Sequence, residues 1–136
     1  MAVRLSRPLK TLFSSKTPSI LRTMSSSAPK VREFLVILPD KPGVRQKRLE
    51  VRPTHFQNMK PHVESGNWKM GGALLNEVPA DETAANFDFF GSTVVCKGVS
   101  KEAVLEELKK DIYATSGVWD VDKIQIYPFI CAFRNP

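Results

Sequence analysis

The chain has 136 residues, which suffices for one domain and leaves little room for a second. Hydrophobic residues make up 42% of the sequence and charged residues 25%, as in an ordinary soluble globular protein. The longest apolar run covers only residues 34–38, whereas a helix that spans a bilayer needs roughly 20 apolar residues. We therefore expect no transmembrane helix and no membrane partner.

The net charge of +6 is concentrated at the N-terminus. Residues 33–136 carry 13 basic and 14 acidic side chains, a net charge of −1. A high pI often indicates a nucleic-acid partner, but here the excess charge lies outside the part that is expected to fold. We therefore expect no nucleic-acid binding. Residues 1–32 hold seven of the 20 basic residues and none of the 14 acidic ones: Arg4, Arg7, Lys10, Lys16, Arg22, Lys30 and Arg32.

Residues 1–30 have the composition of a targeting segment, rich in Arg, Lys, Ser and Thr and without acids. This pattern is typical of a mitochondrial transit peptide, and it lacks the continuous apolar stretch of a secretory signal. A disordered basic tail is the alternative. Met24 is a second candidate start, which would give a cytoplasmic form. We predict a leader over residues 1–30 of a mitochondrial protein, followed by one domain over residues 31–136.

The first half of the domain predicts strand, helix and strand. The apolar run in "EFLVILPD" indicates a strand buried on both faces, which ends at the prolines and glycine of "PDKPG". A helix is expected over residues 44–64, with Pro53 as a kink or a fresh first turn. Residues 68–78 are expected to form the second strand. The apolar residues near helical spacing on the helix are Leu49, Phe56, Met59 and Val63.

The second half predicts strand, helix and strand again. Residues 87–98 are aromatic and β-branched, with Gly91 interrupting them as a bulge would. Residues 100–113 give the clearest helical pattern in the chain, with Ser100 as its N-cap. The last strand is expected within residues 121–133.

This order of elements predicts the α+β class. Two strand–helix–strand units form the ferredoxin-like βαββαβ sandwich, in which an antiparallel sheet carries both helices on one face. The other face is then open, with Trp68, Phe89, Val94 and Ile124 as its candidate lining residues. An exposed apolar sheet face favours a partner, and a second copy would bury it. We expect a homodimer through this open face.

The RNA-recognition module has the same element order and is the main alternative. Its central strands carry aromatic residues on which bases stack. Here the third strand lacks the Lys/Arg–Gly–aromatic opening, and the net charge of the domain disfavours phosphate binding.

Metal and cofactor motifs are also missing from the sequence. Cys96 and Cys131 lie in apolar segments without partners at metal-binding spacing, so free thiols are expected. His55 and His62 lie two helical turns apart, but no third ligand of suitable type accompanies them, which disfavours zinc. The "PDKPG" turn lacks the glycines and the Lys-Ser/Thr ending of a phosphate loop. We expect no metal and no cofactor.

Four segments occur in a characteristic order: "RPTHF", "GNWKMGGAL", "FFGSTVV" and "KKDIYATSGVW". Together they resemble the YCII-related (YciI-like) family over about residues 33–133. The resemblance implies a dimeric α/β-barrel of two ferredoxin-like protomers, with a His–Asp pair in a cleft. That pair corresponds to His55 in "RPTHF" and Asp111 in "DIY". Many members have Asp-Pro-aromatic at the second place, whereas Ile112 takes the place of the proline here.

The chemistry of these residues suits proton transfer. A neutral imidazole exchanges protons at physiological pH, and a carboxylate on one ring nitrogen fixes its tautomer. Arg52 lies one helical turn before His55 and is a candidate to hold a substrate carboxylate. Ser92 and Tyr113 are further candidate substrate contacts, although no base adjoins Ser92 to make it a nucleophile. Each of these residues has a structural role as its alternative. His55 would be a boundary histidine and Arg52 a solvated helix charge. Ser92 would be a small residue beside a bulge and Tyr113 a core ring.

We therefore predict a small cofactor-independent enzyme of the lyase or isomerase type. It would move a proton on a small, cyclic or anionic substrate, with His55 as general acid/base and Asp111 orienting it. The resemblance implies this class of substrate, because family relatives in ring-degradation pathways are dehydrochlorinases or related lyases. The alternative is a non-catalytic dimeric module that binds a small molecule or a protein.

Overall fold

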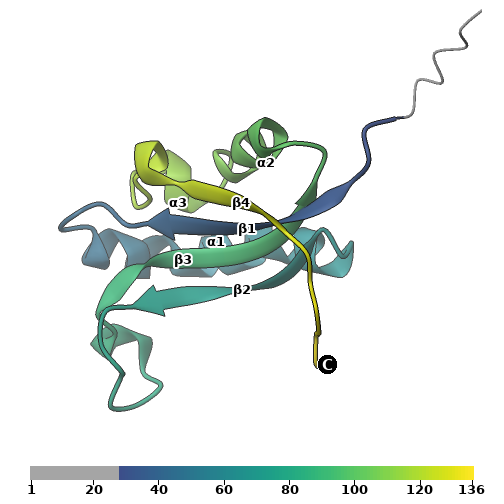
Figure 1. The fold of residues 1–136 in the computed structure, drawn as a ribbon. Coiled ribbons are helices and arrows are strands. Elements are labelled where there is room, and N and C mark those ends of the chain that lie inside the picture. The colour runs from purple at the N-terminus through teal and green to yellow at the C-terminus, as the bar shows by residue number, and fades with distance from the viewer. Residues whose placement is uncertain (1–27) are drawn as a thin grey trace, which may run out of the picture.

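The computed structural model describes residues 28–136, and most of the predicted leader lies outside the described part (Figure 1). The strands β2 (Trp68–Leu75) and β4 (Gln125–Phe129) are shorter than the sequence predicted. Two single 3₁₀ turns, Ala84–Asn86 and Val121–Lys123, accompany the main elements. In chain order the strands and α-helices are β1 (Arg32–Pro39), α1 (Arg45–Glu64), β2 (Trp68–Leu75), β3 (Phe89–Gly98), α2 (Lys101–Leu108), α3 (Ile112–Thr115) and β4 (Gln125–Phe129).

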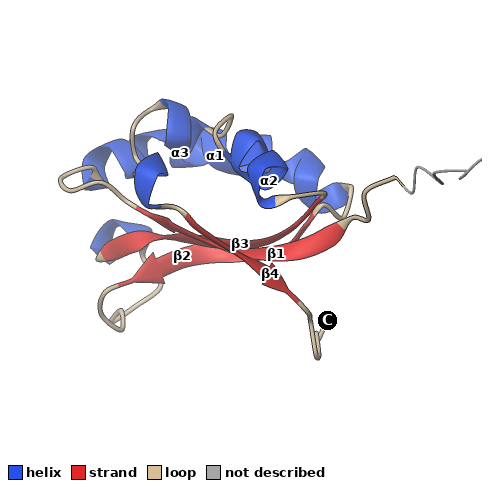
Figure 2. Cartoon of the chain, turned by 45° about the horizontal axis from the view of Figure 1, so that its top comes forward, coloured by secondary structure: helices blue, strands red, loops and turns tan. Residues whose placement is uncertain are grey.

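The four strands form one antiparallel sheet in the order β2-β3-β1-β4. β1 is central, so that Val36 pairs with Val94 of β3 on one side and with Ile126 of β4 on the other. The helices α1, α2 and α3 lie on one face of this sheet (Figure 2). These features confirm the predicted α+β class, the antiparallel sheet and the strand–helix order.

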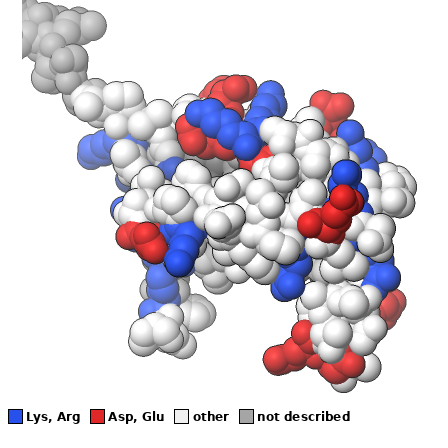
Figure 3. All heavy atoms as spheres, turned by 180° about the vertical axis from the view of Figure 1, so that it is seen from behind, with Lys and Arg blue, Asp and Glu red and all other residues white. Residues whose placement is uncertain are grey.

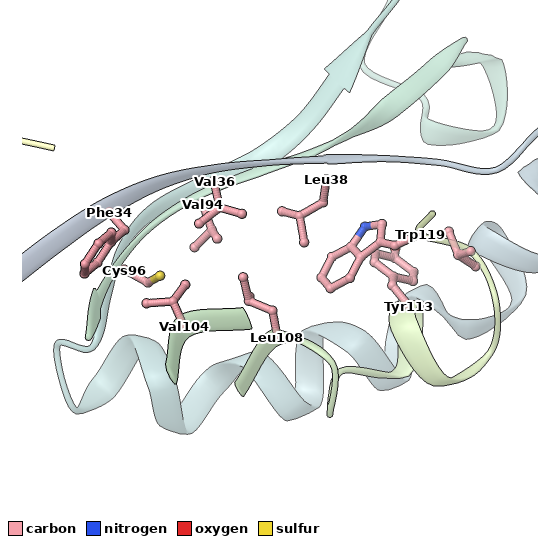
Figure 4. Packing of buried hydrophobic residues seen from close by; sticks show 10 residues of the cluster. Phe34, Val36, Leu38, Val94, Cys96, Val104, Leu108, Tyr113 and Trp119 are labelled. Carbon is pink, nitrogen blue, oxygen red and sulfur yellow. The ribbon is translucent and has the colours of Figure 1, made fainter. Parts of the chain in front are cut away.

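The hydrophobic core lies between the sheet and the helices. Alternate residues of β1 point towards the helices, where they meet Val104 and Leu108 of α2 and the ring of Trp119 (Figure 4). Burying a side chain of this size contributes about 1.5–3 kcal/mol. The buried residues of β1 are Phe34, Val36 and Leu38.

The helix α1 is continuous, and the predicted fresh start at Pro53 is not seen. Pro53 and Pro61 are both exposed, so water can bond the carbonyls that these prolines leave without an N–H donor. The predicted apolar stripe is wrong in part, because Phe56 and Val63 remain 44% and 52% exposed. The side chains that α1 buries are charged or titratable, as described below.

The predicted helix over residues 100–113 is in fact two helices. Ser100 caps α2 as predicted, because its hydroxyl accepts a hydrogen bond of 3.0 Å from the Ala103 N–H. The chain then turns, and Asp111 caps α3 by accepting a bond of 2.9 Å from the Tyr113 N–H. The Asp111 side chain therefore occupies a helix start rather than the flank of a longer helix.

The irregularity expected near Gly91 is present. The register between β2 and β3 shifts between Leu74 and Leu75, opposite this part of β3. Gly91 is buried against β1, and a Cβ there would collide with the backbone of Leu38 and Pro39. A glycine is needed here because it lets the two strands approach.

The prediction of which residues line the open sheet face is wrong. Val94 lies in the core, and Trp68 and Ile124 pack against it on the helix side. Phe89 lines a pocket on that same side. Successive side chains of a strand point to opposite faces, so a one-residue error inverts the assignment. The intervening residues face the open side, among them Leu35, Ile37, Val95 and Tyr127.

Candidate functional site

A pocket of about 420 Å³ lies between α1 and the strands β2 and β3. Its wall is largely apolar, and no carboxylate of residues 28–136 belongs to it. The aromatic and small residues of the lining include Phe56, Trp68, Gly71, Ala73, Phe87 and Phe89. The lining side chains that carry nitrogen or oxygen include Arg48, Arg52, His55, Ser92, Tyr113 and Trp119.

One face of α1 supplies the basic groups of this pocket. Arg48, Arg52 and His55 follow one another at spacings of four and three residues, which places them on one side of the helix. Arg48 is 3% exposed and His55 9% exposed. A helix that packs on a sheet usually presents aliphatic residues there, because burying a charge without partners is costly. The partners of these side chains are therefore central to the site.

His55 and Asp111 form a buried pair that joins α1 to the start of α3. The distance from His55 Nδ1 to Asp111 Oδ1 is 2.8 Å. The same oxygen accepts the bond from the Tyr113 N–H that caps α3. The helix start thus holds the carboxylate in place, and the carboxylate in turn orients the imidazole.

The pair assigns a tautomer to the neutral imidazole. An ionised carboxylate can only accept hydrogen bonds, so the proton lies on Nδ1 of His55 and leaves Nε2 with a free lone pair. Nε2 makes no hydrogen bond within residues 28–136, and His55 lines the pocket. The Tyr113 ring stacks on the imidazole at 4.0 Å between centroids, and Trp119 meets it edge-on at 5.9 Å. These rings restrict the imidazole to one orientation.

Arg48 stands at the centre of a second buried network. Its Nη1 donates to both carboxylate oxygens of Asp40, at 2.7 and 2.9 Å, and its Nη2 donates to Ser92 Oγ at 2.9 Å. The guanidinium lies 4.5 Å from the ring centroid of Phe89 and 4.7 Å from that of Tyr113. The charge of Arg48 is therefore neutralised by a carboxylate that lies outside the pocket lining.

Burial changes the proton affinity of two groups near these networks. Burial raises the pKa of the Asp40 carboxyl, and the Arg48 guanidinium opposes this rise. Burial also raises the pKa of Tyr113 above its usual value near 10. The phenol therefore stays protonated at neutral pH and remains a hydrogen-bond donor.

Arg52 differs from Arg48 in having no carboxylate partner among the described residues. Its guanidinium lies over the ring of Phe56, 4.6 Å from the centroid, and the residue is partly exposed. A positive charge with free N–H groups at the edge of an apolar pocket can bind a carboxylate or another anion.

The structure brings the predicted site residues together. Arg52, His55, Ser92 and Tyr113 all line the pocket, and Asp111 contacts the imidazole from behind. Two further groups near the pocket were not predicted from the sequence, the Arg48–Asp40 ion pair and the indole of Trp119. Arg48 lies on the same helical face as the two α1 residues that were named, so the spacing contained a usable signal. No residue spacing in the sequence indicated the turn that brings Trp119 back to Ser92.

The other titratable residues within residues 28–136 do not line this pocket. Cys96 and Cys131 are free, as predicted, and burial raises the pKa of the Cys96 thiol to about 11. The His62 ring stacks on Trp68 at 4.6 Å between centroids. Within residues 28–136, no group of three or more His, Cys, Asp or Glu side chains is placed to hold a metal ion.

Charges of both signs are mixed on the surface. Figure 3 shows basic and acidic side chains next to one another on the face seen from behind, without one dominant sign. No helix within the described range has the length and apolar character that crossing a membrane requires.

Comparisons with known proteins found a matching family model and several similar sequences. The model of the YCII-related domain matches residues 33–130. An aspercryptin biosynthesis cluster protein B of Emericella nidulans is 36% identical over 76% of this chain, which spans 66% of that protein. A fusaric acid biosynthesis protein 2 of Gibberella fujikuroi is also 36% identical, over 75% of this chain and 96% of its own length.

A solved structure shares the fold. It is a 5-chloro-2-hydroxyhydroquinone dehydrochlorinase from Burkholderia phenoliruptrix AC1100, in complex with 2,5-dihydroxybenzoquinone. The TM-score is 0.60 with 19% sequence identity, over 72% of this chain and 93% of the other. At this identity the likeness concerns the fold alone.

Proposed function

The chain belongs to the YCII-related domain family, and on that premise we propose that it is a cofactor-independent proton-transfer enzyme of the lyase or isomerase type. The observation that supports this most is the His55–Asp111 pair, 2.8 Å apart, at the wall of a largely apolar pocket. A general base needs an orienting partner on one nitrogen and a free lone pair on the other. His55 has both.

The proposed step transfers a single proton. Nε2 of His55 takes a proton from a carbon next to a carbonyl group of the substrate, and the electron pair of that C–H bond forms an enolate. Asp111 stabilises the imidazolium that results. The imidazolium then returns the proton to another atom of the ring, as in an isomerase. In a lyase, the enolate electrons form a double bond, the leaving group departs with the electron pair of its bond, and the imidazolium gives its proton to that leaving group.

The pocket favours a small anionic ring as substrate. Its volume of about 420 Å³ suits a single-ring compound, and its aromatic walls offer stacking surfaces. Arg52 supplies a positive charge without a carboxylate partner in the described residues, while no carboxylate lines the pocket to repel an anion. The fold neighbour binds a ring of this kind, and the curated relatives belong to biosynthesis clusters, so a hydroxylated or carboxylated ring is the proposed substrate class.

The test is hydrogen exchange at carbon. A panel of single-ring hydroxyquinones and ring carboxylates, including 2,5-dihydroxybenzoquinone, is incubated with the protein in D₂O, and C–H exchange is followed by NMR. We expect catalysed exchange with at least one compound, and a decrease of about 10²- to 10⁴-fold in the His55→Gln variant. The Asp111→Asn variant should also lose exchange, because an amide no longer stabilises the imidazolium.

His62→Gln is the matched control, since it removes the other histidine, which stacks on Trp68 outside the His–Asp pair. Exchange that persists in His55→Gln at the rate of this control would refute the proposal. A panel that binds to the pocket without any exchange would favour the alternative, a non-catalytic binding module.

We also propose that the protein is a homodimer that joins through the open sheet face, in line with the dimer that the resemblance implies. From the composition of the leader we propose that residues 1–30 direct the protein to mitochondria. The support for the dimer is that Met70 and Tyr127 lie on that face and are 58% and 50% exposed. The support for import is the acid-free basic composition of the leader.

A further inference from the structure

The hydroxyl of Ser92 has an unusual hydrogen-bond balance. Its oxygen accepts one bond from Arg48 Nη2 at 2.9 Å and a second from Trp119 Nε1 at 3.1 Å. A hydroxyl oxygen has two lone pairs and one proton. Both lone pairs are therefore occupied, and only the O–H proton remains to be bonded.

Within residues 28–136 the Ser92 hydroxyl donates no hydrogen bond, and its oxygen is only an acceptor. The neighbouring Thr93 gives a comparison, because its hydroxyl donates to the Val36 carbonyl at 2.9 Å. Ser92 is 6% exposed and forms part of the pocket wall. A buried donor without an acceptor costs free energy in the folded protein, unless a ligand supplies the acceptor.

We propose that Ser92 is an oriented hydrogen-bond donor to an oxygen atom of the substrate, and that Arg48 and Trp119 are the residues that position it. This inference rests on the proposed function and specifies its substrate: a ring that presents a carbonyl, enolate or carboxylate oxygen to Ser92. As His55 removes a proton from the adjacent carbon, negative charge develops on that oxygen. A fixed donor at this place stabilises the charge without reorganisation.

Arg48 is held too firmly to act as a mobile ligand group. Asp40 binds its Nη1 through both carboxylate oxygens, and the rings of Phe89 and Tyr113 flank the guanidinium. These contacts fix the guanidinium, so Arg48 acts through Ser92. The Nε of Arg48 is buried and has no hydrogen-bond partner within residues 28–136. The charge of Arg48 also withdraws electron density from the Ser92 oxygen, which makes the hydroxyl a better donor and a poorer nucleophile.

The test uses 2,5-dihydroxybenzoquinone as a probe, because its hydroxyl groups ionise as acids and change its visible absorption. A donor that contacts the anion should make the bound probe ionise at a lower pH than the free probe. In the Ser92→Ala variant we expect affinity for the probe anion to fall about tenfold to a hundredfold, and ionisation of the bound probe to move up by about one to two pH units. Trp119→Phe, which removes one positioning donor, should give a smaller change in the same direction.

Ser116→Ala is the matched control, because the Ser116 hydroxyl is buried and donates no hydrogen bond within residues 28–136, like that of Ser92, but Ser116 does not line the pocket. Thermal melting verifies that each variant is folded. If Ser92→Ala binds and ionises the probe as the control does, the inference about Ser92 is wrong. This result would not affect the proposed base, which the exchange experiment on His55→Gln tests separately. Loss of probe binding in Ser92→Ala together with undiminished exchange in His55→Gln would uphold Ser92 and refute the proposed base. A wild-type protein that does not bind the probe would contradict the substrate class.

Discussion

Arg48 and His55 are the side chains that set this domain apart from a simple α+β sandwich. Each is buried beneath α1 and paired with one carboxylate from outside that helix. Asp40 follows β1, and Asp111 precedes α3. Burying an ion pair rarely adds net stability relative to apolar residues. The Arg48–Asp40 ion pair and the His55–Asp111 hydrogen bond beside one pocket therefore support the proposed ligand site.

The Arg48–Asp40 pair makes a quantitative prediction. Removing the guanidinium in Arg48→Met leaves a buried carboxylate without its partner, so the free energy of unfolding should fall by about 3–5 kcal/mol in denaturant titrations. The double variant Arg48→Met/Asp40→Asn should be more stable than the single one, because no charge remains buried.

Arg45→Met is the control for this prediction, since Arg45 lies exposed at the start of the same helix. It should change the free energy of unfolding by less than about 1 kcal/mol. An Arg48→Met variant as stable as this control would mean that Asp40 finds other partners or becomes protonated at little cost.

At the level of single elements, hydrophobic pattern and turn residues were sufficient for most of the fold. The apolar run of β1, the N-cap at Ser100 and the glycine in β3 each act locally, and each was predicted where the structure has it. The break between α2 and α3 was missed because the apolar spacing continues through Ile112. There the cap at Asp111, whose carboxylate also binds His55, outweighs the helical pattern.

The face of each strand could not be predicted in the same way. Both faces of β1 and β3 are apolar, so a period of two residues gives no indication of which side meets the helices. The face of α1 that lines the pocket was hard to identify for the opposite reason. Its buried residues are polar, and a search for apolar stripes passes over them.

Gly91 supports a prediction at this scale. A methyl group there would meet the backbone of β1, which cannot move without disrupting the central strand pair. Gly91→Ala should lower the free energy of unfolding by about 2 kcal/mol or more. Gly72→Ala in β2 is the control, because nothing lies within 4 Å of its added carbon, and it should be neutral or slightly stabilising. Equal stability of the two variants would refute the close-packing account.

For the whole molecule, the open sheet face predicts self-association. Light scattering coupled to size-exclusion chromatography should give the mass of a dimer, and the double variant Met70→Glu/Tyr127→Glu should shift it to a monomer, because charges would be buried at the interface. Val78→Glu alters another exposed apolar residue, 94% exposed and outside the sheet, and should leave the dimer intact. A monomeric wild type would contradict the proposed interface.

The leader predicts where the whole protein is found. The full chain fused in front of a fluorescent protein should co-localise with mitochondria, and a fusion without residues 1–30 should not. Replacing Arg4, Arg7 and Lys10 by glutamine should weaken import, because the basic charge is the recognised feature. Identical distributions of all three fusions would contradict a targeting role.

The most direct test of the account is the tautomer of His55, which requires no substrate. In ¹⁵N-labelled protein at a pH where the imidazole is neutral, long-range ¹H–¹⁵N NMR spectra distinguish a protonated from an unprotonated ring nitrogen. The His–Asp pair predicts that Nδ1 carries the proton and that Nε2 is free, and that this preference is lost in Asp111→Asn. A proton on Nε2 in the wild type would mean that the base assigned to the pocket is already occupied, and the proposed mechanism would fail.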